Sequence, residues 1–193
     1  MQVNVRQIYG NWDLGYSLDR HTIRSVPIGP NEFGHMQFDT TRPEAGEALF
    51  QLKYRSDFSQ VIPIATQIYQ SLAGYFPSVG LVVPMPASQS RARQPVAEIA
   101  KALAGLMGIP CFENLLIKTK ITPTMKNIAC RDDKVRCLLD SFAINDQLPE
   151  GFHTVLIVDD IYDTGSSLEA ATSVLRTYRK IDKIYVTTVT RKK

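Results

Sequence analysis

The chain has 193 residues, of which 44% are hydrophobic and 21% charged, values typical of one soluble globular domain with a single substantial core. Its formal charge of +3 is too small to indicate a nucleic-acid ligand, and no apolar run approaches the roughly 20 residues that cross a bilayer. Three cysteines, odd in number and without CxxC spacing, and an N-terminus without a secretory pattern favour a cytoplasmic protein with reduced thiols.

The first 50 residues are expected to form an irregular N-terminal cap. Residues 1–44 are rich in Gly, Pro, Asn and Asp between short apolar bursts, which is typical of short strands and turns. The aromatic residues of this segment suit a core or a dimer surface, which leaves a homodimer open. These aromatic residues are Tyr9, Trp12, Tyr16, Phe33 and Phe38.

From residue 45 onward, apolar periodicity predicts helices and then an alternation of buried strands and helices. Continuous apolar strands separated by helices predict an α/β fold, with a doubly wound, mostly parallel sheet in residues 51–193. The expected helices cover residues 45–54, 57–75, 95–107 (ended by Gly108) and 167–179. The expected strands cover residues 79–83, 114–118, 154–158 and 184–189.

Ligands of such sheets bind beyond the carboxyl ends of the strands, so the loop after Val158 is of interest. Here a buried strand delivers two adjacent acids, Asp159 and Asp160, and a loop of small hydroxylated residues then opens a helix. The two carboxylates are suited to a ribose diol or to Mg²⁺ held through water.

The second half of this loop has the features of an anion site. Backbone N–H groups of residues 164–167 can surround one phosphate, Gly165 allows close approach, and the helix N-terminus adds partial positive charge. A structural alternative is that Ser166 and Glu169 form a capping box that only starts the helix. A diol site and a phosphate site a few residues apart together describe a ribose 5-phosphate.

The segment Val155–Ser167 resembles the motif with which type I phosphoribosyltransferases bind 5-phosphoribosyl-1-pyrophosphate (PRPP). The resemblance implies that Asp159 and Asp160 contact the ribose hydroxyls and Mg²⁺, and that Asp163 is catalytic near the acceptor, as in purine-salvage transferases. A hood that stacks the acceptor base is then an alternative interpretation of the aromatic N-terminal residues. The residues that it places around the 5-phosphate are Asp163, Thr164, Gly165, Ser166 and Ser167.

A wider resemblance, over about residues 49–191, is to the ComF-like branch, also described as amidophosphoribosyltransferase-related. It lies in LKYR (Leu52–Arg55), VVPMP, the AEIAKALAGLMGIP helix and the basic stretch before VDD, although the N-terminal zinc element of that branch is missing. The resemblance implies that the loop after Val83 binds pyrophosphate and that a basic lid closes over the site. The pyrophosphate candidates are Ala87, Ser88, Gln89 and Arg91, with Arg93 as an alternative to Arg91. The lid candidates are Lys118, Lys120, Lys126 and Arg131.

The sequence leaves three functions open. The first is an enzyme that uses PRPP and Mg²⁺ to place a phosphoribosyl group on a nucleobase or amine nitrogen, releasing pyrophosphate. The second is a non-catalytic protein that senses PRPP and acts in regulation or, like ComF-like proteins, in DNA uptake. The third, a receiver-like domain with an acidic Mg²⁺ pocket, is disfavoured by the phosphate loop that directly follows the acids.

Overall fold

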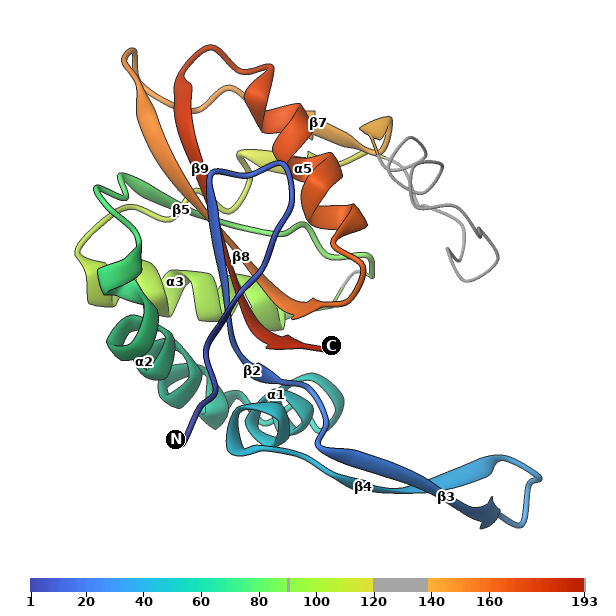
Figure 1. Cartoon of the computed structure of the whole chain (residues 1–193). Coiled ribbons are helices and arrows are strands. Elements are labelled where there is room, and N and C mark those ends of the chain that lie inside the picture. Colours follow the sequence, from blue (N-terminus) through green and yellow to red (C-terminus); the bar gives the residue numbers. More distant parts are fainter. Residues whose placement is uncertain (90, 120–138, 193) are drawn as a thin grey trace.

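The computed structural model describes residues 1–89, 91–119 and 139–192, which form a twisted sheet with helices on both faces (Figure 1). The sheet order is β1-β2-β9-β8-β5, in which only β1 is antiparallel to its neighbour. The predicted α/β fold with a mostly parallel sheet is therefore confirmed. The strands are β1 (Arg6–Gln7), β2 (Leu14–Arg20), β5 (Leu81–Pro84), β8 (His153–Tyr162) and β9 (Ile181–Arg191).

Alternating side chains of the parallel strands supply two cores. One core lies under the first three helices and includes Leu156 and Val158, while the other lies under the last helix and includes Val155 and Ile157. The first three helices are α1 (Glu44–Tyr54), α2 (Val61–Leu72) and α3 (Pro95–Met107), and the last is α5 (Ser166–Arg176). Short 3₁₀ turns, Phe58–Gln60 and Ala73–Tyr75, flank α2.

Most predicted elements are present with small shifts of their ends. α3 has the predicted bounds, and Gly108 ends it in the left-handed conformation with φ +68°. Residues 57–75, predicted as one helix, form α2 and its two 3₁₀ turns instead, and β8 continues through Tyr162 instead of ending at residue 158.

The predicted strand 114–118 does not enter the central sheet. It forms β6 (Leu116–Lys118), which pairs antiparallel with β7 (Phe142–Ile144) in a separate two-stranded sheet. The apolar residues Leu115, Leu116 and Phe142 are buried against the second core. A short apolar run therefore marks burial correctly, whereas its sheet partner depends on contacts that are distant in sequence.

The N-terminal segment is divided between the sheet and a projecting arm. β2 lies inside the central sheet, parallel to β9, whereas β3 (Arg24–Pro30) and β4 (Met36–Thr41) form an antiparallel hairpin that extends away from the body (Figure 1). The aromatic residues are divided too, since Trp12 is buried while Phe33 and Phe38 are exposed. The boundary near residue 50 stays a prediction.

Two neighbouring strands of the sheet lead the chain in opposite directions. After β5 and α3 the chain returns to the outer edge of β5, where Cys111 forms an isolated parallel β-bridge with Val82. After β8 and α5 it continues instead to β9, on the opposite side of β8 from β5. Such a divergence leaves a crevice beyond the carboxyl ends of β5 and β8, where α/β sheets bind their ligands. Among the described residues, no helix is long and apolar enough to span a bilayer.

Candidate functional site

β8 carries two acids to the carboxyl edge of the sheet. Val155–Val158 are fully buried between β5 and β9, and Asp159 and Asp160 follow at the point where the neighbouring strand β5 has already ended. Because β8 continues to Tyr162 beside β9, the backbone of both acids is held by ladder pairing. The main chain thus fixes the acids in place before any ligand binds.

The two acids differ in their partners. Asp159 lies beside Asp160, and burial together with the charge of Asp160 raises the pKa of Asp159 to about 8. The backbone N–H of Asp160 donates to Asp159 Oδ1 at 2.8 Å, and Lys53 lowers the same pKa in part. The Lys53 ammonium group donates to Asp160 Oδ2 in an ion pair.

A cavity of about 760 Å³ opens beside these acids, within the size range of small-molecule sites. Both acids line it, together with parts of α1, the loop after β5, the start of α3 and the segment that leads into β6. The lining residues are Lys53, Tyr54, Pro84, Met85, Pro86, Ala87, Ser88, Gln89, Arg91, Gln94, Pro95, Val96, Ala97, Glu113, Asn114, Leu116, Ile117, Lys118, Asp159 and Asp160.

The loop after β5 contributes all four of the predicted pyrophosphate residues to this cavity. Ala87, Ser88 and Gln89 lie on its wall, and Arg91 donates through Nη1 to the Lys53 carbonyl oxygen at 3.0 Å. This last contact ties the loop to α1. The alternative candidate Arg93 is not part of the cavity wall: it pairs with Glu98, and its guanidinium group lies over the Phe58 ring.

Of the four lid candidates, the structure describes Lys118. It belongs to β6 and lines the cavity, where its Nζ donates to Ser88 Oγ at 3.2 Å and burial lowers its pKa. Lys118 thus joins the loop after β5 to the small antiparallel sheet. Lys120, Lys126 and Arg131 lie outside the described residues.

The predicted phosphate loop surrounds a second, smaller pocket of about 80 Å³. A buried site needs roughly 10–15 Å³ of such space for one water molecule, so this pocket accommodates a larger group. Asp159 lines it as well as the large cavity, which makes the two sites neighbours. The other lining residues are Ile161, Tyr162, Asp163, Thr164, Gly165, Ser166, Ser167 and Leu168.

Gly165 is required by the shape of this loop. Its φ of +80° lies in the left-handed region, and an added Cβ would lie 2.9 Å from Cε2 of Tyr162. α5 begins at the next residue, Ser166, with Gly165 as its N-cap and no capping side chain bonded there. The capping box of Ser166 and Glu169 is therefore wrong, because Ser166 already belongs to the helix.

Ser166 is buried, and its Oγ lies 3.0 Å from Thr164 Oγ1 in a hydrogen bond. The loop thus closes on itself and leaves the helix N-terminus facing the small pocket. Such a terminus combines unsatisfied backbone N–H groups with partial positive charge, which suits an anion.

Two cation contacts at this site were missed by sequence reasoning. Lys192, just beyond β9, donates to Asp163 Oδ2 at 2.6 Å, and Lys53 pairs with Asp160 as described above. In the sequence, Lys53 stands out only as part of LKYR in the family resemblance, and Lys192 belongs to no recognisable pattern. Both contacts join segments that are far apart in the chain.

Comparisons with known proteins give fold-level matches only. No family model matches the chain, and no curated protein is similar to it in sequence. An adenine phosphoribosyltransferase structure is 20% identical, with a TM-score of 0.44 over 86% of this chain and 84% of that one. The adenine phosphoribosyltransferase of Saccharomyces cerevisiae, complexed with an imino-altritol bisphosphate and adenine, is 17% identical, with a TM-score of 0.48 over 87% and 83%.

The orotate phosphoribosyltransferase of Aeropyrum pernix is 17% identical, with a TM-score of 0.38 over 86% of this chain and 74% of that one. At these identities and TM-scores, the similarities do not decide a substrate or an activity. The ComF-like branch is not among the matches named here and stays a prediction.

Proposed function

We propose that the chain is a phosphoribosyltransferase that binds PRPP with Mg²⁺ and transfers the phosphoribosyl group to a nitrogen of a nucleobase or amine. The observation that carries the proposal is that Asp159 lines both the 760 Å³ cavity and the 80 Å³ pocket. A carboxylate pair suited to a diol and a helix start suited to a phosphate therefore adjoin at the end of one strand. Ribose 5-phosphate carries both a diol and a phosphate, the two groups that these neighbouring sites suit.

In this proposal each part of the ligand has its own segment of the chain. The 5-phosphate binds at the start of α5, and the ribose hydroxyls face Asp159 and Asp160. The pyrophosphate lies in the large cavity along residues 87–89, where Arg91 and Lys118 supply positive charge. The remaining volume of that cavity is available to the acceptor.

The residues present fit a magnesium ion that is shared with the ligand. Asp159 and Asp160 offer hard oxygen donors. Burial and, after it, the charge of Asp160 raise the pKa of Asp159, and a bound cation would stabilise the two carboxylates. Among the described residues there is no group of three or more acidic, His or Cys side chains able to hold a metal. An ion bound here would therefore need oxygens from PRPP, and it would supply charge neutralisation for the pyrophosphate.

The chain's own residues would act by positioning and by charge stabilisation. Departure of pyrophosphate leaves positive charge on the ribose C1 and negative charge on the leaving group. Arg91 and Lys118 can stabilise the negative charge of the pyrophosphate. The resemblance to purine-salvage transferases assigns Asp163, which lines the small pocket, the role of accepting the proton of the attacking nitrogen. A segment that covers the open side of the cavity would exclude water from the reaction.

One observation favours the second candidate function, a PRPP-sensing protein without turnover. Asp163, the proposed proton acceptor, is already engaged by Lys192. If that pair persists in the complex, PRPP could bind without transfer. The two functions differ in pyrophosphate release, which only the enzyme shows.

Both candidate functions require PRPP binding, which calorimetry with PRPP and Mg²⁺ measures. We expect binding by the natural chain and its loss in Asp159→Asn and Asp160→Asn, whereas Asp182→Asn, at an exposed acid near the start of β9, binds normally. Unaltered binding in the first two variants would reject the diol role. Pyrophosphate release with a panel of nucleobases and amines then separates the enzyme, which turns over with at least one acceptor, from the sensor.

A further inference from the structure

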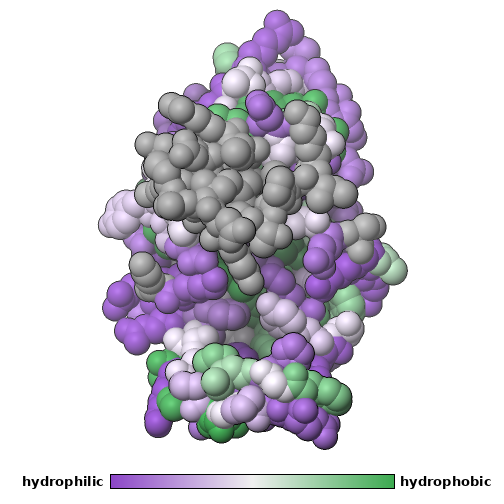
Figure 2. All heavy atoms as spheres, turned by 90° about the vertical axis from the view of Figure 1, so that its right-hand side faces the viewer, coloured by the Kyte–Doolittle hydropathy of each residue, from purple (hydrophilic) through white to green (hydrophobic). Residues whose placement is uncertain are grey.

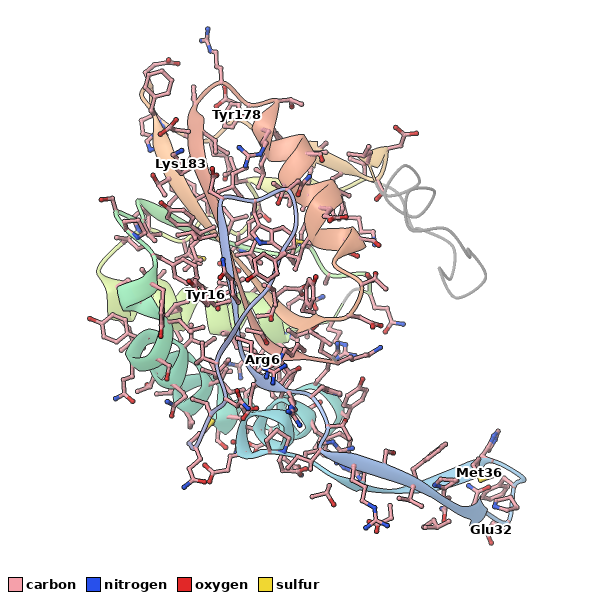
Figure 3. All side chains as sticks on the ribbon, in the orientation of Figure 1. Arg6, Tyr16, Glu32, Met36, Tyr178 and Lys183 are labelled. Carbon is pink, nitrogen blue, oxygen red and sulfur yellow. The ribbon has the colours of Figure 1, made fainter. Side chains whose placement is uncertain are left out.

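The β3–β4 hairpin is an arm with an uncovered apolar face. It projects from the body of the molecule, with Glu32 and Met36 near its tip, and β3 and β4 pack mainly on each other (Figures 1 and 3). An isolated two-stranded hairpin is marginally stable in water, so an arm of this kind is expected to pack against something. In Figure 2 the arm points toward the viewer at the bottom of the picture, where hydrophobic residues lie among hydrophilic ones.

Strand register divides the arm into two unlike faces. Paired residues share a face, and the pairs Pro27–Phe38 and Pro30–Met36 lie on the same one, because Met36 and Phe38 are two residues apart in β4. The opposite face carries Arg24 and Asp39 instead. Met36 and Phe38 are 55% and 56% exposed, so within the described residues nothing covers the apolar face. The other exposed apolar side chains of this part of the chain are Ile23, Ile28 and Phe33.

The same chain carries a second uncovered surface, on the outer side of α2. Ile62 and Tyr69, seven residues apart and therefore on one side of the helix, are 62% and 41% exposed. No charged residue occurs between positions 58 and 90, so α2 contributes no charged side chain to this outer side. The N-terminal ammonium group of Met1 is bonded to Gln67 of the same helix. α2 and the arm lie on different sides of the body (Figure 1), which keeps these two surfaces apart within one molecule.

We propose that a second copy of this chain occupies both surfaces, in a two-fold dimer in which the arm of each copy packs on α2 of the other. Strands of six and seven residues reach roughly 20 Å, far enough to cross a neighbouring helix. In a two-fold dimer both arms and both α2 helices are covered at once, so neither the apolar face of the arm nor the outer side of α2 stays exposed. Neither the apolar face of the arm nor α2 itself contributes a charged side chain to the contact, and the cores of stable interfaces are depleted of charge in the same way.

The available area also suits a dimer. A large aromatic side chain buries about 150–250 Å², so the exposed apolar side chains of one arm supply several hundred square ångströms. Two arms together with the two helix surfaces they cover reach the roughly 1,200–2,000 Å² of a stable interface. This inference does not depend on the proposed enzymatic function.

Sedimentation of the full chain over a range of concentrations tests the dimer. We expect the natural chain to be dimeric, and Phe38→Glu or Ile62→Glu to raise the dissociation constant about 1,000-fold, because each contact occurs twice and a central side chain contributes about 30-fold. Gln37→Glu, on the other face of the arm, is the matched control and should stay dimeric. All three side chains are exposed, so circular dichroism should report a folded protein in each case.

A mixing experiment tests which surfaces meet. In a mixed dimer of Phe38→Glu and Ile62→Lys, each of which alone should associate weakly, one arm–helix contact places a carboxylate against an ammonium group while the other contact is intact, so mixing should restore association in part. A mixture that stays monomeric would overturn the pairing of arm with α2. A natural chain that is monomeric at every concentration, or a dimeric Phe38→Glu, would overturn the proposal and assign the arm to a different partner.

Discussion

Lys53 of α1 forms an ion pair with Asp160 at the end of β8, joining residues 107 positions apart in the sequence. Both side chains are largely buried, with 26% and 15% of their surface exposed. The pair places a cation on the wall of the large cavity, next to two adjacent carboxylates.

Removing the cation should destabilise the fold. Lys53→Met leaves Asp160 without its partner, and we expect the free energy of unfolding to fall by about 1–3 kcal/mol, between the values for surface and buried ion pairs. Urea denaturation measures the change. Lys101→Met is the control, because Lys101 pairs with Glu98 and Glu113 at a more exposed position and should contribute less than about 1 kcal/mol. Equal losses in the two variants would contradict a special role for Lys53.

Stability should fall as the pH rises through the range set by Asp159. Its pKa is about 8 in the folded chain and about 3.9 in an unfolded one, so between these values the folded state holds an extra proton. The free energy of unfolding should therefore decrease with pH, by at most about 1.4 kcal/mol per pH unit from this group, and the decrease should end above about pH 8.

Asp159→Asn should remove this contribution, while Asp182→Asn should keep it. Denaturation in urea at several pH values between about 5 and about 9 supplies the comparison. Lys53→Met should move the midpoint of the Asp159 titration upward, because Lys53 lowers that pKa. An Asp159 carboxyl that titrates near its ordinary value by carbon NMR would refute the proposed electrostatics.

Gly165→Ala should disturb both the loop and the small pocket where we propose that phosphate binds. The change forces a side chain onto a φ of +80° and against Tyr162, so we expect a loss of about 1–3 kcal/mol in the free energy of unfolding. Binding of inorganic phosphate should be lost in the same variant. Gly105→Ala, in α3 with open space around it, is the matched control and should stabilise the chain by about 0.4–1 kcal/mol. Normal phosphate binding by Gly165→Ala would argue against the helix start as the phosphate site.

Variants of the Asp163–Lys192 pair distinguish a role of Asp163 in the reaction from a role in stability. Both side chains are about half exposed, so Lys192→Met should change the free energy of unfolding by less than about 1 kcal/mol. If Asp163 accepts a proton, Asp163→Asn should lower kcat about 100-fold or more while the affinity for PRPP stays within a few-fold. An Asp163→Asn variant that turns over normally would remove Asp163 from the mechanism.

Some of the site could be predicted because its geometry is local. The buried strand, the two acids and the small-residue loop are consecutive, so residues 155–167 suffice to predict that the acids and the loop lie next to each other, as the two neighbouring pockets show. The end of α3 could be predicted for the same reason, because it depends on the left-handed backbone conformation of Gly108 alone. The capping box of Ser166 and Glu169 is also a local pattern, and it was wrong because Gly165 takes the N-cap position.

By itself, the sequence determined the α/β alternation, the order of acids and phosphate loop, and the apolar faces that bury the sheet. Only the tertiary structure decided that β2 joins the sheet beside β9, that β6 leaves it, and that Lys53 and Lys192 meet the acids. The physical reason is distance along the chain: periodicity and turn chemistry act over a few residues, whereas strand neighbours and ion pairs depend on how whole elements pack.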